Sequence, residues 1–167
     1  RIPVDRLFHN EGKYFREIDT AGTSLSGADH GVQWADFDGD GDLDISLTEG
    51  YNIKGHHPVL RNELTDDLAV KSLQVTVSDG EGLYTRAGAE VRLYDGDNQL
   101  VATRLVTTGE GYNSQSNQAV HFGLGDIGPV SVEVTFLTNE GRKIQKADNI
   151  DPANYQGTSL KIKQNLY

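Results

Sequence analysis

The sequence has no cysteine and no methionine. The absence of cysteine excludes disulfide bonds, thiolate metal ligands and cysteine nucleophiles. Because the chain begins at Arg1 and lacks an initiator methionine, we expect it to be a processed form or a part of a longer protein. No apolar run approaches the roughly 20 residues of a membrane-spanning helix, so we expect no membrane insertion.

Positive charge is also scarce. The chain has 15 Lys and Arg residues and 25 Asp and Glu residues, which gives a formal net charge of -10. Phosphate binding needs clustered basic residues, so this balance argues against a nucleic-acid partner. Five of the acidic residues lie in the single stretch Asp36–Asp44, called the acidic loop below, and the rest of the chain is only mildly acidic.

Short strands separated by Gly, Asp and Asn turns predict an all-β fold. In the second half of the chain, apolar residues alternate with polar ones, as in Leu73, Val75 and Val77. The same pattern predicts further strands at residues 89–93, 100–107, 119–124, 130–137, 142–146 and 159–162. About seven strands in roughly 100 residues suggest a compact β-sandwich-like domain. We therefore predict two units, an N-terminal unit (residues 1–66) and a C-terminal unit (residues 67–167).

The N-terminal unit contains a loose internal repeat. Leu7-Phe8-His9-Asn10-Glu11 returns as Val59-Leu60-Arg61-Asn62-Glu63, at an offset of 52 positions. That spacing is close to the roughly 40–50 residues of a propeller blade. A lone blade cannot bury both of its faces, so we expect an incomplete array that is completed by further repeats or by another chain. Its open blade edges predict a protein partner or self-assembly.

The acidic loop has the spacing of a calcium site. Carboxylates at relative positions 1, 3, 5 and 9 converge only if the chain curls tightly, and Gly41 at position 6 permits that curl. Hard oxygen donors without His or Cys favour Ca²⁺. An EF-hand would need a bidentate Glu at position 12 and flanking helices, whereas Leu47 stands there and both flanks read as strands. We predict a strand–loop–strand calcium site that stabilises the fold. Its side-chain ligands are Asp36, Asp38, Asp40 and Asp44, and Asp42 supplies a main-chain carbonyl.

Both units resemble known families. The N-terminal unit resembles FG-GAP/VCBS-type propeller repeats at residues 7–12, 31–44 and 60–62. The C-terminal unit resembles the ASPIC/UnbV domain of the cartilage-acidic-protein-like family at residues 88–91, 109–116, 121–125 and 144–156. It departs at Phe136–Gly141, where the family commonly has a Trp-Pro-Ser-Gly turn. The resemblance implies calcium binding, a secreted or cell-surface location and a role in adhesion or matrix, with no generally established catalytic activity.

Other candidate sites are weaker. The polar loop Gly109–Ser116 carries Tyr112 and Gln115, which suit glycan or protein recognition, although its glycines also suit a tight connection. We interpret His121 as a hydrogen-bonding residue at a strand end rather than as a metal ligand. A transition-metal site at His30, His56 and His57 is disfavoured, because adjacent strand residues point to opposite faces.

No catalytic motif is present. The chain has no nucleophile elbow, phosphate-binding glycine loop or zinc motif. We therefore expect a non-catalytic, calcium-binding adhesion, scaffold or assembly protein outside the cell. The alternative is a carbohydrate-binding appendage of an exported enzyme.

Overall fold

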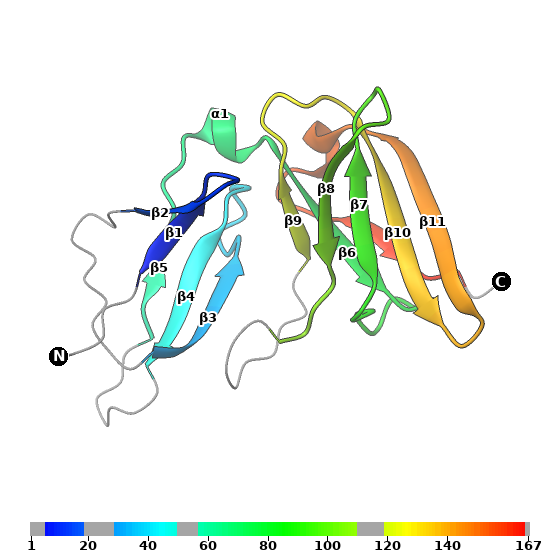
Figure 1. The fold of residues 1–167 in the computed structure, drawn as a ribbon, viewed down its shortest axis with the longest axis horizontal. Helices are drawn as coiled ribbons and strands as arrows, with labels where there is room; N and C mark the ends of the chain where they lie inside the picture. The colour runs from blue at the N-terminus through cyan, green and yellow to red at the C-terminus, as the bar shows by residue number, and fades with distance from the viewer. Residues whose placement is uncertain (1–5, 19–28, 50–56, 110–118, 166–167) are drawn as a thin grey trace.

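The protein is all-β in a computed structural model that describes residues 6–18, 29–49, 57–109 and 119–165 (Figure 1). No helix in these ranges is long and apolar enough to cross a membrane. The elements, in chain order, are β1 Leu7–Asn10, β2 Phe15–Ile18, β3 Asp29–Ala35, β4 Asp44–Glu49, β5 Val59–Leu60, α1 Asp66–Ala69, β6 Ser72–Ser78, β7 Glu90–Tyr94, β8 Leu100–Leu105, β9 Val120–Gly123, β10 Val130–Thr138, β11 Gly141–Ile150, a 3-10 turn Pro152–Tyr155 and β12 Leu160–Lys163.

The first five strands form two small sheets. The β1-β2 hairpin is a sheet of its own, and β3, β4 and β5 form an antiparallel sheet in that order. The two copies of the internal repeat coincide with β1 and β5, so the recurring residues mark recurring strands. A propeller blade has four strands in one sheet. Among the described residues of this unit no sheet has four, and the propeller interpretation stays a prediction.

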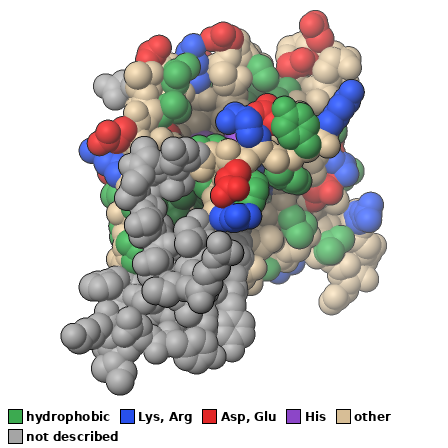
Figure 2. Space-filling model, turned by 60° about the vertical axis from the view of Figure 1, so that its left-hand side comes forward, with side chains coloured by type: hydrophobic (Ala, Val, Ile, Leu, Met, Phe, Trp, Pro, Cys, Tyr) green, Lys and Arg blue, Asp and Glu red, His purple; other side chains and the backbone are tan. Residues whose placement is uncertain are grey.

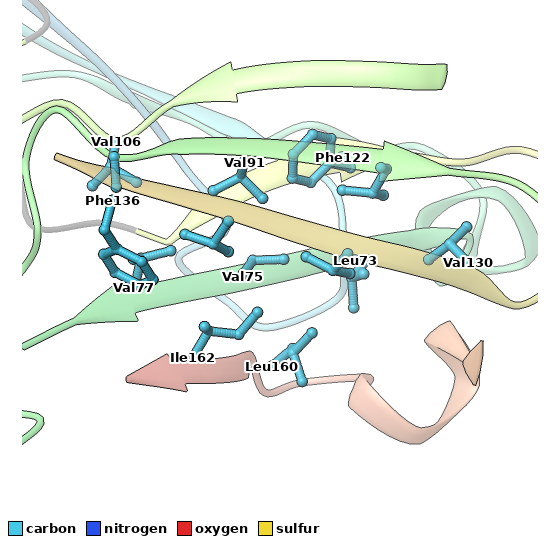
Figure 3. Close-up of a cluster of buried hydrophobic side chains, with 14 of the residues drawn as sticks. Leu73, Val75, Val77, Val91, Val106, Phe122, Val130, Phe136, Leu160 and Ile162 are labelled. Atoms are coloured by element: carbon cyan, nitrogen blue, oxygen red, sulfur yellow. The ribbon is translucent and has the colours of Figure 1, made fainter. Parts of the chain in front are cut away.

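The other seven strands form a β-sandwich. One sheet has the order β11-β10-β7-β8, and the other has the order β12-β6-β9, with β12 parallel to β6. Alternation drives this arrangement: β6 buries every second residue from Leu73 to Val77. β10 buries its alternate apolar residues from Val130 to Phe136, together with Glu133 and Thr135 between them. The buried side chains of both sheets form one core, in which Phe122 of β9 also lies (Figure 3).

The strands predicted for the C-terminal unit are confirmed, with differences at their ends. β8 stops at Leu105. Beyond it, the amide of Val106 donates to the carbonyl of Ala89 and the carbonyl of Val106 accepts from the amide of Gly88, outside the strand ladder. β11 extends to Ile150, well beyond the predicted end at Lys146, because it stays paired with the long strand β10. The apolar pattern did not indicate the full length of β11, because the strand lies at the edge of the sheet, is mostly exposed and carries mainly polar residues.

Candidate metal centre

The acidic loop joins β3 to β4 and is shaped by its own glycines. β3 ends at Ala35 and β4 begins at Asp44, so the whole motif turns between two paired strands. Gly39 and Gly41 have φ angles of 80° and 104°, a region that residues with a Cβ rarely adopt. The predicted strand–loop–strand geometry is therefore confirmed, and the tight curl depends on both glycines.

Three of the predicted ligands come together. One carboxylate oxygen from each of Asp36, Asp38 and Asp40 lies within 4.8 Å of the others. Backbone amides hold two of these side chains in place. Asp36 accepts hydrogen bonds from the amides of Gly39 (2.7 Å) and Gly41 (3.1 Å), and Asp40 accepts one from the amide of Asp42 (3.1 Å).

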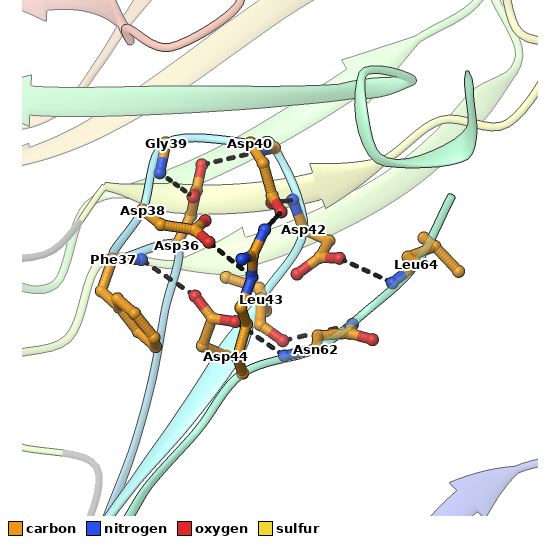
Figure 4. Close-up of polar contacts among 12 residues, drawn as sticks. Asp36, Phe37, Asp38, Gly39, Asp40, Asp42, Leu43, Asp44, Asn62 and Leu64 are labelled. Carbon is orange, nitrogen blue, oxygen red and sulfur yellow. Dashed lines mark hydrogen bonds and ion pairs between the residues drawn. The ribbon is translucent and has the colours of Figure 1, made fainter. Parts of the chain in front are cut away.

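Asp44 lies outside this group and closes the base of the loop. Its side chain is buried, with a residue exposure of 1%. One carboxylate oxygen accepts from the amide of Phe37 (3.1 Å), and the other accepts from the amide of Asn62 (2.8 Å) (Figure 4). Each oxygen keeps a second lone pair that could still bind a metal ion. The ligand role of Asp44 therefore stays a prediction, in addition to its role in closing the loop.

Asp42 has a role that the sequence pattern did not indicate. The residue is only 4% exposed, and one carboxylate oxygen accepts from the amide of Leu64 (3.2 Å). The other oxygen, Oδ1, is buried without a partner and turns back from Leu64 toward the loop (Figure 4). Burial and the negative charge of Asp40 raise the pKa of Asp42, and the charges of Asp44 and Asp38 add to that rise against the opposing Leu64 amide.

The unpartnered oxygen of Asp42 bears on whether the acidic loop suits a bound cation. A buried carboxylate oxygen without a donor costs free energy, because nothing replaces the water that it loses. A hard divalent ion held by Asp36, Asp38 and Asp40 would bring positive charge into the loop that also carries Asp42, and calcium accepts such an all-oxygen set. The donor set therefore fits Ca²⁺, with Asp36, Asp38 and Asp40 as convergent side chains and the carbonyl of Asp42 as the predicted main-chain ligand.

A protein cation already lies over part of the loop. The guanidinium of Arg61, just after β5, is 2.8 Å from a carboxylate oxygen of Asp38 and 3.5 Å from one of Asp40. The charge of Asp38 and the hydrogen bond to Asp40 raise the pKa of Arg61. Sequence reasoning missed this contact, although Arg61 stands in the second copy of the internal repeat.

The far side of the loop rests on the sandwich. The carbonyl oxygen of Gly41 accepts from the hydroxyl of Ser72 (2.7 Å) and lies 2.9 Å from Nε2 of His121. Asp36 accepts a third contact, from the side-chain amide of Gln74 (2.7 Å). The interpretation of His121 as a hydrogen-bonding residue is thus confirmed, with a partner 80 positions away in the chain.

The structure gives no site at the remaining predicted residues that it describes. Tyr112, Gln115 and His56 lie outside the described residues. His30 belongs to β3, but its side chain is not described, and His57 is exposed.

Comparison with known proteins identifies one part of the chain. Residues 84–164 match the family described as ASPIC and UnbV, which confirms that part of the resemblance. The match begins after β6 and ends just after β12, so the sandwich includes one central strand that the match does not cover. No curated protein matches the chain. The resemblance of the N-terminal unit to FG-GAP/VCBS repeats stays a prediction.

Proposed function

We propose that this chain is a calcium-binding, non-catalytic module of an extracellular protein that serves adhesion, scaffolding or assembly. One observation carries the calcium assignment: a single loop holds three convergent carboxylates and, at Asp42, a buried carboxylate oxygen without a hydrogen-bond partner. Bound calcium would supply positive charge at the centre of the loop, and the chain's own backbone amides already orient the carboxylates that receive it.

A low calcium affinity of the site would agree with an extracellular location. Asp38 and Asp40 form ion pairs with Arg61, and each carboxylate oxygen of Asp44 already accepts a hydrogen bond from a backbone amide. A loop with these competing contacts suits an affinity of about 10⁻⁴–10⁻³ M, the range of extracellular calcium modules. The ASPIC and UnbV match agrees with this placement through the secreted or cell-surface location that the resemblance implies.

The proposed partner surface lies on the N-terminal unit. A groove of about 440 Å³ runs between the β1-β2 hairpin and the β3-β4-β5 sheet and is lined mainly by apolar residues such as Phe8, Trp34 and Ile45. Hydrophobic side chains reach the surface between charged ones in the view of Figure 2. Within the described residues β3 pairs only with β4, so its outer edge offers unpaired backbone groups to a protein partner or a second copy.

A calcium titration tests the metal assignment. The single tryptophan, Trp34, lies two positions before Asp36 and provides a fluorescence signal close to the loop. We expect saturable Ca²⁺ binding with a Kd of about 1 mM or tighter, and weaker binding of Mg²⁺, which demands a stricter octahedral geometry. Asp38→Ala is expected to weaken binding, whereas Asp126→Ala, which removes an exposed carboxylate paired with Lys71, leaves it unchanged. Binding that stays above the millimolar range in the unmodified protein would contradict the assignment.

Sedimentation velocity tests assembly. If the groove and the β3 edge bind a second copy, the chain sediments as a dimer or larger species at tens of micromolar, and Trp34→Ala shifts it toward monomer. Val59→Ala, which trims an exposed apolar residue of β5 outside the groove lining, is the matched control. A monomer at every concentration, with and without chelator, argues against self-assembly and leaves a different protein as the partner.

A further inference from the structure

We propose that Gln74, Ser72 and His121 of the sandwich are positioning residues for the metal loop, so that cation binding and docking of the two units are coupled. This inference rests on the proposed calcium site and adds residues that lie outside the acidic motif. All three belong to the three-stranded sheet, on β6 and β9, and all three donate to the loop across the boundary between the units.

The contacts at Gly41 fix one peptide plane of the loop. A backbone carbonyl has two lone pairs, and here Ser72 and His121 occupy both. Since a carbonyl only accepts, His121 carries a proton on Nε2. Two donors from different strands hold the peptide between Gly41 and Asp42, and they thereby fix the direction in which the chain leaves Asp40 and enters Asp42.

The contact at Asp36 orients one of the carboxylates directly. Oδ2 of Asp36 accepts from Gln74 (2.7 Å) as well as from the amide of Gly41 (3.1 Å). Outer partners of this kind hold a ligating carboxylate in one orientation, and their loss typically weakens metal affinity 10- to 100-fold. Gln74 therefore acts on the metal through Asp36 without touching it.

The loop lies so close to the C-terminal unit that little can intervene. A Cβ added at Gly41 would meet the carbonyl oxygen of Ala69 at 2.5 Å. A cavity of about 10 Å³ separates Asp36 and Asp40 from the segment that includes Tyr155 and Thr158, which is room for about one water molecule. We therefore expect the acidic loop to adopt the arrangement that binds metal when it is packed against the C-terminal unit.

Coupling of this kind is reciprocal. If docking on Gln74 and His121 raises calcium affinity by a given factor, bound calcium raises the docking equilibrium constant by the same factor. The ion then joins the two units and does more than stiffen a hairpin.

Calcium titration of full-chain variants, followed by Trp34 fluorescence, tests the coupling. Gln74→Leu and His121→Leu are each expected to weaken calcium binding about 10-fold. His121→Gln keeps a side-chain nitrogen donor near Nε2 and should restore most of the affinity, which a merely space-filling role of the ring would not explain. Gln145→Leu is the matched control, because Gln145 bridges Lys163 and Asn165 by two similar hydrogen bonds far from the loop.

The outcomes separate this inference from the proposed function. Folded Gln74→Leu and His121→Leu proteins, verified by circular dichroism, that bind calcium as tightly as the unmodified chain overturn the coupling alone. If one of them fails to fold, the other variant and His121→Gln decide. An unmodified chain that binds no calcium overturns both the coupling and the calcium assignment.

Discussion

Removal of 10 mM calcium by a chelator is expected to lower the melting temperature of this protein by about 3–10 °C. An ion that binds only the folded state adds about 1.4 kcal/mol at a concentration 10-fold above its Kd and about 2.7 kcal/mol at 100-fold, and 10 mM spans this range for a Kd of about 10⁻⁴–10⁻³ M. For a domain of this size, about 1 kcal/mol corresponds to roughly 2–4 °C in Tm. The physical cause is the negative charge of the acidic loop, which bound calcium would neutralise; burial first, and then the charge of Asp40, raise the pKa of Asp42 there.

Asp40→Ala should reproduce most of the chelator effect. The substitution removes one of the three convergent carboxylates and the hydrogen bond that Asp40 accepts from the amide of Asp42. Calorimetric melting curves of the variant in 10 mM calcium and in chelator should therefore nearly coincide. Asp126→Ala is the control, because it removes one negative charge outside the loop and should keep the full calcium response. A variant Tm that still rises with calcium as steeply as that of the unmodified chain would show that the ion binds elsewhere.

The sequence predicts most of the local structure because that structure depends on local patterns. Alternating apolar residues define the strands of the sandwich, and the spacing of Asp36, Asp38 and Asp40 with Gly41 defines the curl of the loop. Each of these features needs only neighbours within one strand or one turn.

The features that the sequence did not reveal depend on distant partners. The carboxylate of Asp42 is held by an amide 22 positions later, and the carbonyl of Gly41 is held by a ring 80 positions later. Neither pairing follows from a period or a motif. The first exists only after the chain beyond β5 returns to the loop, and the second exists only after the two units meet. Glu133 illustrates the same limit: it lies on the polar face of β10, yet it is 8% exposed, because ion pairs with Arg92 and Lys146 cover it.

Docking of the loop gives the second large expected effect, at Gly41. Gly39→Ala and Gly41→Ala both force a side chain into a positive-φ conformation, at a cost of about 1–3 kcal/mol each. Only Gly41→Ala also places a Cβ 2.5 Å from the carbonyl oxygen of Ala69, because nothing lies within 4 Å of a Cβ at Gly39. The loop must then move away from α1, and the hydrogen bonds from Ser72 and His121 to the Gly41 carbonyl are lost.

The comparison of these two alanine variants isolates docking from backbone strain. Gly39→Ala should lower the Tm by about 2–12 °C, because about 1–3 kcal/mol of backbone strain corresponds to roughly 2–4 °C per kcal/mol, and it should retain a calcium response. Gly41→Ala should lower the Tm further and weaken calcium binding about 10-fold, as loss of the outer hydrogen-bond partners does. Melting curves and Trp34 titrations of both variants measure the difference. If the two variants have the same Tm and the same Kd, the acidic loop does not rest on Ala69 in solution, and the ion stabilises the hairpin alone.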